Sequence, residues 1–300
     1  MPWSGGSVNS GKFCKVMKII GILYFQMLMM VNKQFLPMTY IDGRVERHCT
    51  ECSAERVIIG ALHATPEPYS MPTLMLLQTP PPEFIRSQIQ QMVVDYVTDV
   101  SSVAITADNP LYQLYQYGVG YEVHLYLNAM DGSRGMPVEL IVALDDDDPE
   151  IVLGFLLYLP VSDDPQACTL AYMAVLESHR RQGIARSMLG KALARYPHAE
   201  LSCVVGKAPW FEAMGFQVLN ARGPHVVMNT RDHSTGGLLA VLDVAPIYQS
   251  VEVRQIHAYL LKQHGDEAMV EAERERDRQL DRMALQARDF AAGRLNPTRH

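Results

Sequence analysis

The feature that most constrains the fold of this chain is a short strand that leads into a glycine-containing turn and then into a helix. The apolar run Cys168–Val175 is typical of a strand, and the turn Arg180–Ala185 follows it closely. From Ile184 to Tyr196 the apolar residues recur at helical spacing. The first amides of a helix have no partner inside it, and the helix dipole makes that end attractive to anions. The segment therefore predicts a phosphate-binding turn.

The residue types of this turn suit a pyrophosphate. Gly183 permits a close approach of the backbone, and Ala185 is too small to block it. Three arginines, Arg180, Arg181 and Arg186, add positive charge. The same spacing also fits an ordinary helix start with surface arginines, so the surrounding elements have to decide between the two interpretations.

Regular elements surround the turn in a defined order. The predicted helices before it are Glu83–Val97 and Leu111–Tyr126, and the other predicted strands are Thr73–Thr79, Val138–Leu144, Ile151–Leu159, Glu200–Val205, Gln217–Asn220 and His225–Asn229. The acidic turn Asp145–Asp148 makes a hairpin of the two apolar runs that flank it. Its aspartates lack the alternating ligand spacing of a calcium loop, which favours a solvated turn over a metal site.

Residues about 73–231 resemble a GNAT-family N-acetyltransferase, and two motifs carry the resemblance. Arg180, Gly183 and Ala185 match the family's Arg/Gln-x-x-Gly-x-Gly/Ala motif. Val175 matches its Val-x-Pro lead-in, where Glu177 replaces the proline. The resemblance implies the α/β GNAT acyl-CoA N-acyltransferase fold, a mixed and mostly antiparallel sheet flanked by helices.

The second motif lies after the next predicted strand. Trp210, Gly215 and Phe216 match the family's aromatic-Tyr-x-x-x-Gly-Phe signature, and Phe211 stands where the family has tyrosine. That tyrosine usually protonates the departing thiolate. A thiol with a pKa near 8.5 leaves readily as the thiolate, so this departure is tolerable.

The resemblance implies acetyl-CoA as co-substrate, without a metal, and transfer of its acetyl group directly to a primary amine. The main chain of Met173, Ala174 and Val175 would hold the pantetheine, and an N–H near Val175 would polarise the thioester carbonyl. The residues that would hold the pyrophosphate are Arg180, Arg181, Gln182, Gly183, Ile184, Ala185, Arg186 and Ser187.

The general base is the weak point of the resemblance. Neutralising an ordinary alkylammonium near pH 7 costs about 4.6 kcal/mol, so a base is useful. The family often supplies a glutamate on the strand before the turn, whereas Thr169–Val175 contains no carboxylate. This absence favours a water relay or an acceptor amine of low pKa. Tyr172 is the nearest candidate for the relay and Glu177 the next, with His179 and His225 as fallbacks.

The sequence leaves the acceptor open. It is a small-molecule or macromolecular primary amine, and one alternative is an aminoalkyl-modified pyrimidine in DNA, whose amine would have a lowered pKa. A second alternative is a non-catalytic acyl-CoA-binding module, which the missing glutamate and Phe211 favour. A net charge of −7 argues against a protein that coats nucleic acid generally.

Residues 1–70 are expected to be a poorly ordered extension or a mis-assigned start, with Met71 or Met75 as the true one. Their apolar run Ile19–Val31 is shorter than the roughly 20 residues that span a bilayer, so no membrane association is predicted, with a peripheral anchor as the alternative. Cys49 and Cys52 form a lone Cys-x-x-Cys without a second ligand pair. Five cysteines, spread thinly, fit a reducing compartment, and we expect a cytoplasmic protein.

Residues 238–300 are predicted as a helical C-terminal extension with helices at Val251–Gln263 and Glu267–Ala292. Acidic and basic residues alternate along the second helix, which is typical of a solvated helix. Its arginines suggest contact with DNA, and the two helices suggest a homodimer; both remain alternatives to simple solvation. These arginines are Arg274, Arg276, Arg278, Arg282 and Arg288.

Overall fold

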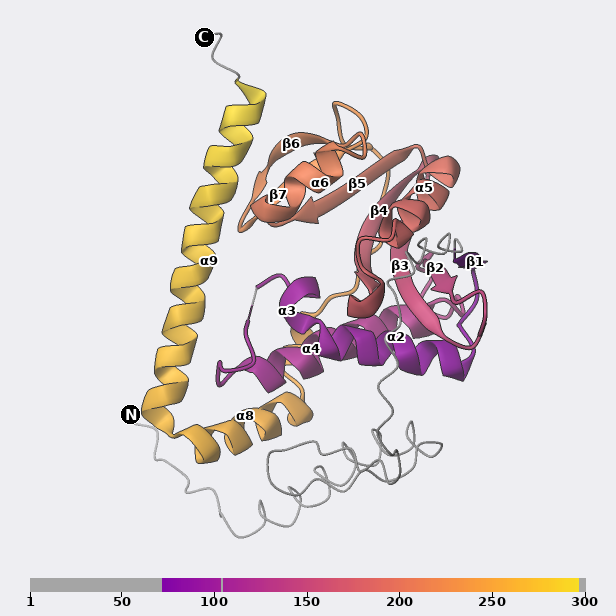
Figure 1. Ribbon diagram of the computed structural model, residues 1–300. Helices are drawn as coiled ribbons and strands as arrows, with labels where there is room; N and C mark the ends of the chain where they lie inside the picture. Colours follow the sequence, from indigo (N-terminus) through magenta and orange to yellow (C-terminus); the bar gives the residue numbers. More distant parts are fainter. Residues whose placement is uncertain (1–71, 104, 297–300) are drawn as a thin grey trace, which may run out of the picture. The chain divides into compact units, whose positions relative to one another are not determined.

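The computed structural model describes residues 72–103 and 105–296, so the predictions for residues 1–70 lie outside the described residues. A seven-stranded sheet has the order β1-β2-β3-β4-β5-β7-β6 (Figure 1). All neighbours are antiparallel except β4 and β5, which are parallel. The strands are β1 (Thr73–Leu77), β2 (Glu139–Leu144), β3 (Val152–Val161), β4 (Asp164–Val175), β5 (His198–Cys203), β6 (Gln217–Arg222) and β7 (His225–Asn229). The predicted mixed, mostly antiparallel sheet is confirmed.

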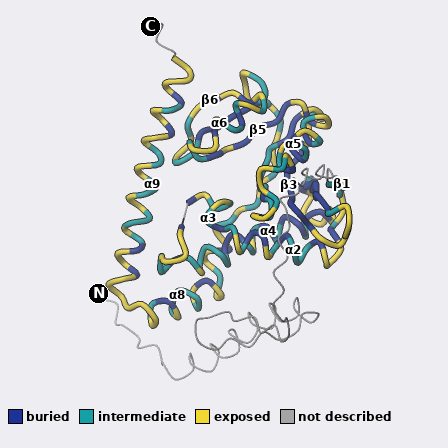
Figure 2. Tube along the Cα trace, in the orientation of Figure 1, coloured by how far each residue is buried: buried dark blue, intermediate teal, exposed yellow. Residues whose placement is uncertain are grey.

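Helices cover both faces of the sheet, which explains why every residue of β2 and β3 is buried (Figure 2). On one face α2 (Glu83–Asp95) and α4 (Tyr112–Ala129) pack over Phe155 and Leu157. On the other face α5 (Ile184–Arg195) packs over Leu156. The predicted first helix ends two residues early, at Asp95, and a separate short helix, α3 (Val97–Val100), follows.

The strand β4 changes partner along its length. It pairs with β3 almost throughout, but only Ala167–Thr169 pair with β5. Leu157 of β3 pairs with Tyr172 and the next residue, Tyr158, pairs with Leu170, so Ala171 is an extra residue, a β-bulge. A bulge increases the local twist, and within the described residues β4 and β5 have no pairing beyond it. The segment Leu170–Val175 therefore presents an open edge on its β5 side.

The C-terminal segment packs against the domain through three helices, α7 (Ala245–Tyr248), α8 (Val251–His264) and α9 (Asp266–Leu295). Although α9 was expected to be solvated, Ala287 and Ala291 are buried in the core beside β6 and β7 (Figure 1). Arg294 donates to both carboxylate oxygens of Glu212, at 2.7 and 3.0 Å.

No helix in residues 72–103 and 105–296 combines the length and hydropathy needed to cross a bilayer.

A buried carboxylate joins the sheet to α5. Glu139 on β2, only 6% exposed, accepts two hydrogen bonds from Arg195 at 2.9 and 3.0 Å. It also accepts from the hydroxyls of Tyr158 and Tyr196 and from the amide of Gln78. Burial alone would raise the pKa of Glu139, but the hydrogen bonds from these donors outweigh it and hold the pKa below its ordinary value.

We expect Glu139→Gln to lower the free energy of unfolding by about 1–3 kcal/mol at pH 7, because Arg195 then loses its charged partner. A lowered folded-state pKa gives stability that is present above the unfolded value and lost as the pH falls through the folded value. Urea unfolding should therefore show a difference in stability between wild type and variant at pH 7 that shrinks once the pH falls below the ordinary glutamate pKa of about 4.3. A difference that is constant with pH would contradict this account of Glu139.

Candidate functional site

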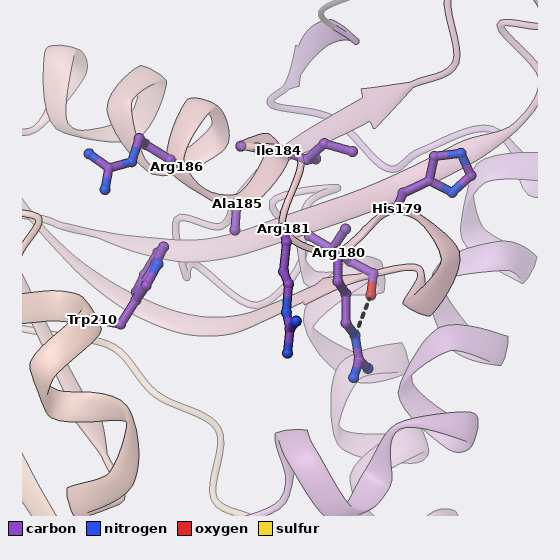
Figure 3. A pocket seen from close by; sticks show the side chains of 9 residues that line it. His179, Arg180, Arg181, Ile184, Ala185, Arg186 and Trp210 are labelled. Atoms are coloured by element: carbon purple, nitrogen blue, oxygen red, sulfur yellow. Dashed lines mark hydrogen bonds between the residues drawn. The ribbon is translucent and has the colours of Figure 1, made fainter. Parts of the chain in front are cut away.

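A hollow of about 320 Å³ opens where β4 meets the turn before α5 (Figure 3). Figure 3 shows Trp210, on α6 (Ala208–Glu212), across the hollow from the turn that carries Arg181. The end of β4, the short helix η1 (Glu177–His179), the turn, the start of α5 and α6 all contribute to the wall. The lining residues are Val175, His179, Arg180, Arg181, Gly183, Ile184, Ala185, Arg186 and Trp210.

The backbone of the turn explains why α5 begins where it does. Gly183 is the residue before the helix and has a φ of 86°, a conformation in which glycine avoids the strain of a side chain. No side chain caps the helix. The Ser187 amide makes the first helical hydrogen bond, to the Gly183 carbonyl at 2.9 Å. The amides of Ile184, Ala185 and Arg186 come earlier and have no partner within the helix, so they can serve an anion.

A second left-handed residue lies in the same turn. Arg181 has a φ of 65°, and it is the one non-glycine residue with positive φ in the described part of the chain. This conformation costs a residue with a side chain about 1–2 kcal/mol. Such strain concentrates where a backbone is shaped for binding.

The three arginines of the turn differ in their partners. Arg180 stacks on the ring of Tyr96 at 4.6 Å, pairs with Asp99 at 3.2 Å and donates to the Val175 carbonyl at 3.3 Å. Arg181 and Arg186 are exposed and form no ion pair with any described carboxylate. Arg180 is therefore engaged in holding the turn, whereas Arg181 and Arg186 are available to a bound anion.

Asp99 also connects the loops that follow β4 and β5, the two strands that separate after Thr169. Its carboxylate pairs with Arg180, which follows β4. Its main-chain carbonyl accepts a hydrogen bond from Lys207, which ends the short helix η2 (Val205–Lys207) after β5. The helix α3 thus ties together the loops that follow β4 and β5.

Seven of the eleven residues predicted to bind the cofactor line the hollow, and Met173, Ala174, Gln182 and Ser187 do not. Met173 packs toward the α5 face of the sheet and Ala174 toward the α4 face. The side chain of Gln182 donates to the Ser178 carbonyl at 3.4 Å.

The residues predicted for catalysis are spread more widely. Glu177 is exposed and does not line the hollow, and its amide donates to the Tyr96 hydroxyl at 2.9 Å. Tyr172 lies on the α4 side of the sheet, in the neighbourhood of Glu122. Burial and the neighbouring Glu122 raise the pKa of Tyr172 well above its ordinary value. Of the fallbacks, His179 lines the hollow, and His225 lies on β7 outside it.

Sequence reasoning missed the place of one residue in the site region. Trp210 was noted only as part of a motif, yet its ring forms one wall, while its neighbour Phe211 is buried against Phe216 at a ring distance of 5.7 Å. Cys203, the last residue of β5, is buried beside Met228 and packs in the core.

No metal site emerges from the residues that the structure describes, where no three His, Cys, Asp or Glu side chains stand close enough to share an ion. The acidic turn between β2 and β3 uses Asp145 to accept from the amides of Asp147 and Asp148, at 2.8 and 3.1 Å. This arrangement is a side-chain-stabilised turn.

Residues 137–218 match the family model described as the acetyltransferase (GNAT) domain. This match includes β2–β5, the turn and the aromatic motif, and the chain therefore contains a GNAT acetyltransferase domain, as predicted. No curated protein matches the chain significantly.

Solved structures of N-acetyltransferases are similar to about half of the chain. The PaiA N-acetyltransferase of Thermoplasma acidophilum, in complex with coenzyme A, is 9% identical with a TM-score of 0.41 and is covered over 99% of its length by 53% of this chain. An acyl-CoA N-acyltransferase from Pseudomonas aeruginosa is 13% identical with a TM-score of 0.36, covering 100% of that chain and 53% of this one.

Two glycines of this region provide a matched test of the turn. Neither Gly183 nor Gly190 has an atom within 4 Å of an added Cβ, so only backbone conformation distinguishes them. We expect Gly183→Ala to destabilise the protein by about 1–2 kcal/mol, because φ is positive there. Gly190→Ala, in the middle of α5, should stabilise it by about 1 kcal/mol. Thermal or urea unfolding of both variants would measure this; shifts of the same sign would contradict the assigned turn.

Proposed function

We propose that this protein transfers an acetyl group from acetyl-CoA to a primary amine. The observation that carries the proposal is the uncapped start of α5, which faces a hollow beside the open edge of β4 inside a GNAT domain. The co-substrate supplies an acetyl group activated as a thioester. The chain has to bind its phosphates, align its pantetheine and prepare the amine.

The pyrophosphate would bind at the amides of Ile184, Ala185 and Arg186. The dipole of the 12-residue α5 favours an anion there, and Arg181 and Arg186 add charge that no carboxylate of the described residues neutralises. Arg180 contributes by holding the turn against Tyr96 and Asp99 rather than by contacting the phosphates. Trp210 offers an apolar wall on the opposite side of the hollow.

The pantetheine would lie along Met173–Val175. These residues belong to the part of β4 that has no β5 partner, so their main-chain groups can bond the amides of the pantetheine as a neighbouring strand would. A β4 amide aimed at the thioester carbonyl would stabilise developing negative charge, an effect worth about 3 kcal/mol in well-studied enzymes.

The acceptor proposed is an amine in general rather than modified DNA. One of the two arguments for DNA was the set of arginines on the C-terminal helix, and in the structure four of these five are paired with acids. Arg278 and Arg282 both pair with Glu275, Arg274 pairs with Glu271, and Arg276 pairs with Asp277. Phosphates would have to displace these carboxylates.

Titration calorimetry with acetyl-CoA tests the binding mode. We expect Arg181→Gln and Arg186→Gln each to weaken binding about tenfold, because each removes a charge-assisted contact with phosphate. Arg134→Gln, at an exposed arginine in the loop between α4 and β2 that does not line the hollow, is the control and should bind as wild type does. Equal affinity in all four proteins would overturn the phosphate site.

Acetyl transfer itself is tested by following thiol release from acetyl-CoA in the presence of primary amines. Amine-dependent release supports the enzyme. Tight coenzyme binding with no amine-dependent release would instead support a non-catalytic acyl-CoA-binding module.

A further inference from the structure

The indole of Trp210 presents a flat aromatic surface to the hollow beside the phosphate turn. Figure 3 shows this side chain rising from α6 toward the start of α5, on the side of the hollow opposite Arg181. Trp210 is only partly buried, although it packs against the core that α5 and α6 share. Part of the ring is therefore open to a ligand in the hollow.

A buried aromatic cluster fixes the orientation of the ring from behind. The rings of Trp210 and Phe211 are 4.8 Å apart and meet at an interplanar angle of 81°, an edge-to-face contact. Phe211 packs in turn on Phe216 at 5.7 Å, and both of these rings are buried. An indole held in this way loses little further conformational freedom when a ligand binds to it.

The ring of Trp210 is free of stacked arginines within the described residues. Arg181 and Arg186 line the hollow together with Trp210, yet neither of them stacks on it. The rings on which arginines do stack are Tyr96, Tyr196 and Phe290. The indole is therefore available to a flat ligand, and two positive charges lie in the same hollow.

A nucleotide combines the two features that the hollow offers. Its phosphates suit the free amides at the start of α5 and the charges of Arg181 and Arg186. Its base has a π-face that stacks on aromatic side chains, and this stacking strengthens binding by about tenfold to a hundredfold per base. Adenine is the one aromatic ring of acetyl-CoA, because the pantetheine arm contains none.

The proposed path of the coenzyme leaves the wall at Trp210 to the adenosine. The pyrophosphate joins the pantetheine on one side to the adenosine on the other. The pantetheine is proposed to follow β4, whose last residue, Val175, accepts a hydrogen bond from Arg180 at 3.3 Å. Figure 3 shows Arg180 on the far side of the hollow from Trp210. The adenosine leaves the pyrophosphate in the other direction, toward the indole.

We propose that Trp210 stacks on the adenine ring of acetyl-CoA and so makes the nucleotide half of the coenzyme a determinant of affinity. This inference rests on the acetyl transfer proposed above and concerns the same hollow. The base is remote from the thioester, so the stack is equally strong before and during acetyl transfer. Its loss should therefore raise the KM for acetyl-CoA and leave kcat unchanged.

Calorimetry with the two halves of the coenzyme tests the assignment. Trp210→Leu should weaken the binding of adenosine 3′,5′-bisphosphate and of acetyl-CoA by about tenfold or more, because the base loses its stacking partner. The same variant should bind 4′-phosphopantetheine as wild type does. Trp210→Phe keeps an aromatic face and should lose less affinity for the bisphosphate than Trp210→Leu.

The matched control is Tyr259→Leu, at an exposed ring of α8 that does not line the hollow. It should bind all three ligands with wild-type affinity. Weaker binding of 4′-phosphopantetheine to Trp210→Leu, with the bisphosphate unaffected, would mean that the indole contacts the pantetheine, and would overturn the proposal. Equal binding of every ligand to every variant would also overturn it.

Tryptophan fluorescence gives a second measurement, which leaves Trp210 unchanged. The chain contains two tryptophans, Trp3 and Trp210, so the variant Trp3→Phe keeps only the indole of the hollow. Adenosine 3′,5′-bisphosphate should quench its emission, because a stacked adenine quenches indole fluorescence, whereas 4′-phosphopantetheine should not. Binding of the bisphosphate without quenching would contradict the stack.

Failure of this inference is distinguishable from failure of the proposed acetyl transfer. A wild-type protein that does not bind acetyl-CoA would refute the acetyl transfer, and the stack with it. Normal binding and transfer in wild type, together with an unchanged KM for acetyl-CoA in Trp210→Leu, would refute only the stack. Thermal unfolding of each variant establishes that the comparison is made between folded proteins.

Discussion

The backbone hydrogen bonding of β4 governs the rest of the domain. A strand inside a sheet normally satisfies its main-chain groups on both sides. Here β4 does so on its β3 side, but on its β5 side only Ala167–Thr169 are paired. The bulge at Ala171 marks the point where the second partner is lost. What remains is an edge within the sheet rather than at its border, beside the uncapped start of α5.

Other contacts keep this unusual edge in place. The buried Glu139 attaches α5 to β2 through Arg195, so the helix start is anchored from its far end. Arg180 holds the turn against α3, and Asp99 extends the connection to the loop after β5. These contacts hold the loops after β4 and β5 together although the two strands themselves separate.

Much of the fold could be predicted from local sequence, because β2 and β3 are continuous apolar runs, α5 has helical periodicity, and turn residues lie at their ends. β4 begins four residues earlier than predicted, at Asp164, since pairing with β3 extends a strand beyond its apolar run. The packing of α9 was missed because its interleaved charges conceal two alanines, Ala287 and Ala291, that face the sheet.

Some features of the candidate site could likewise be predicted from local sequence, and others could not. The turn could be predicted because all its parts lie within seven residues of sequence. The position of Trp210 in the opposite wall could not, because it depends on how α6 packs relative to the turn. The engagement of Arg180 by Asp99 was equally invisible, since the two residues are 81 positions apart.

The ion pair between Arg294 and Glu212 has a consequence for the wall of the hollow that Trp210 forms. Glu212 belongs to the same short helix as Trp210, and Arg294 reaches it from the last turn of α9. Trimming the final helical turn of α9 would release α6 on one side, and the indole would lose part of its support. The tail of the chain, though remote in sequence from the turn, is thus bonded to the helix that carries one wall of the hollow.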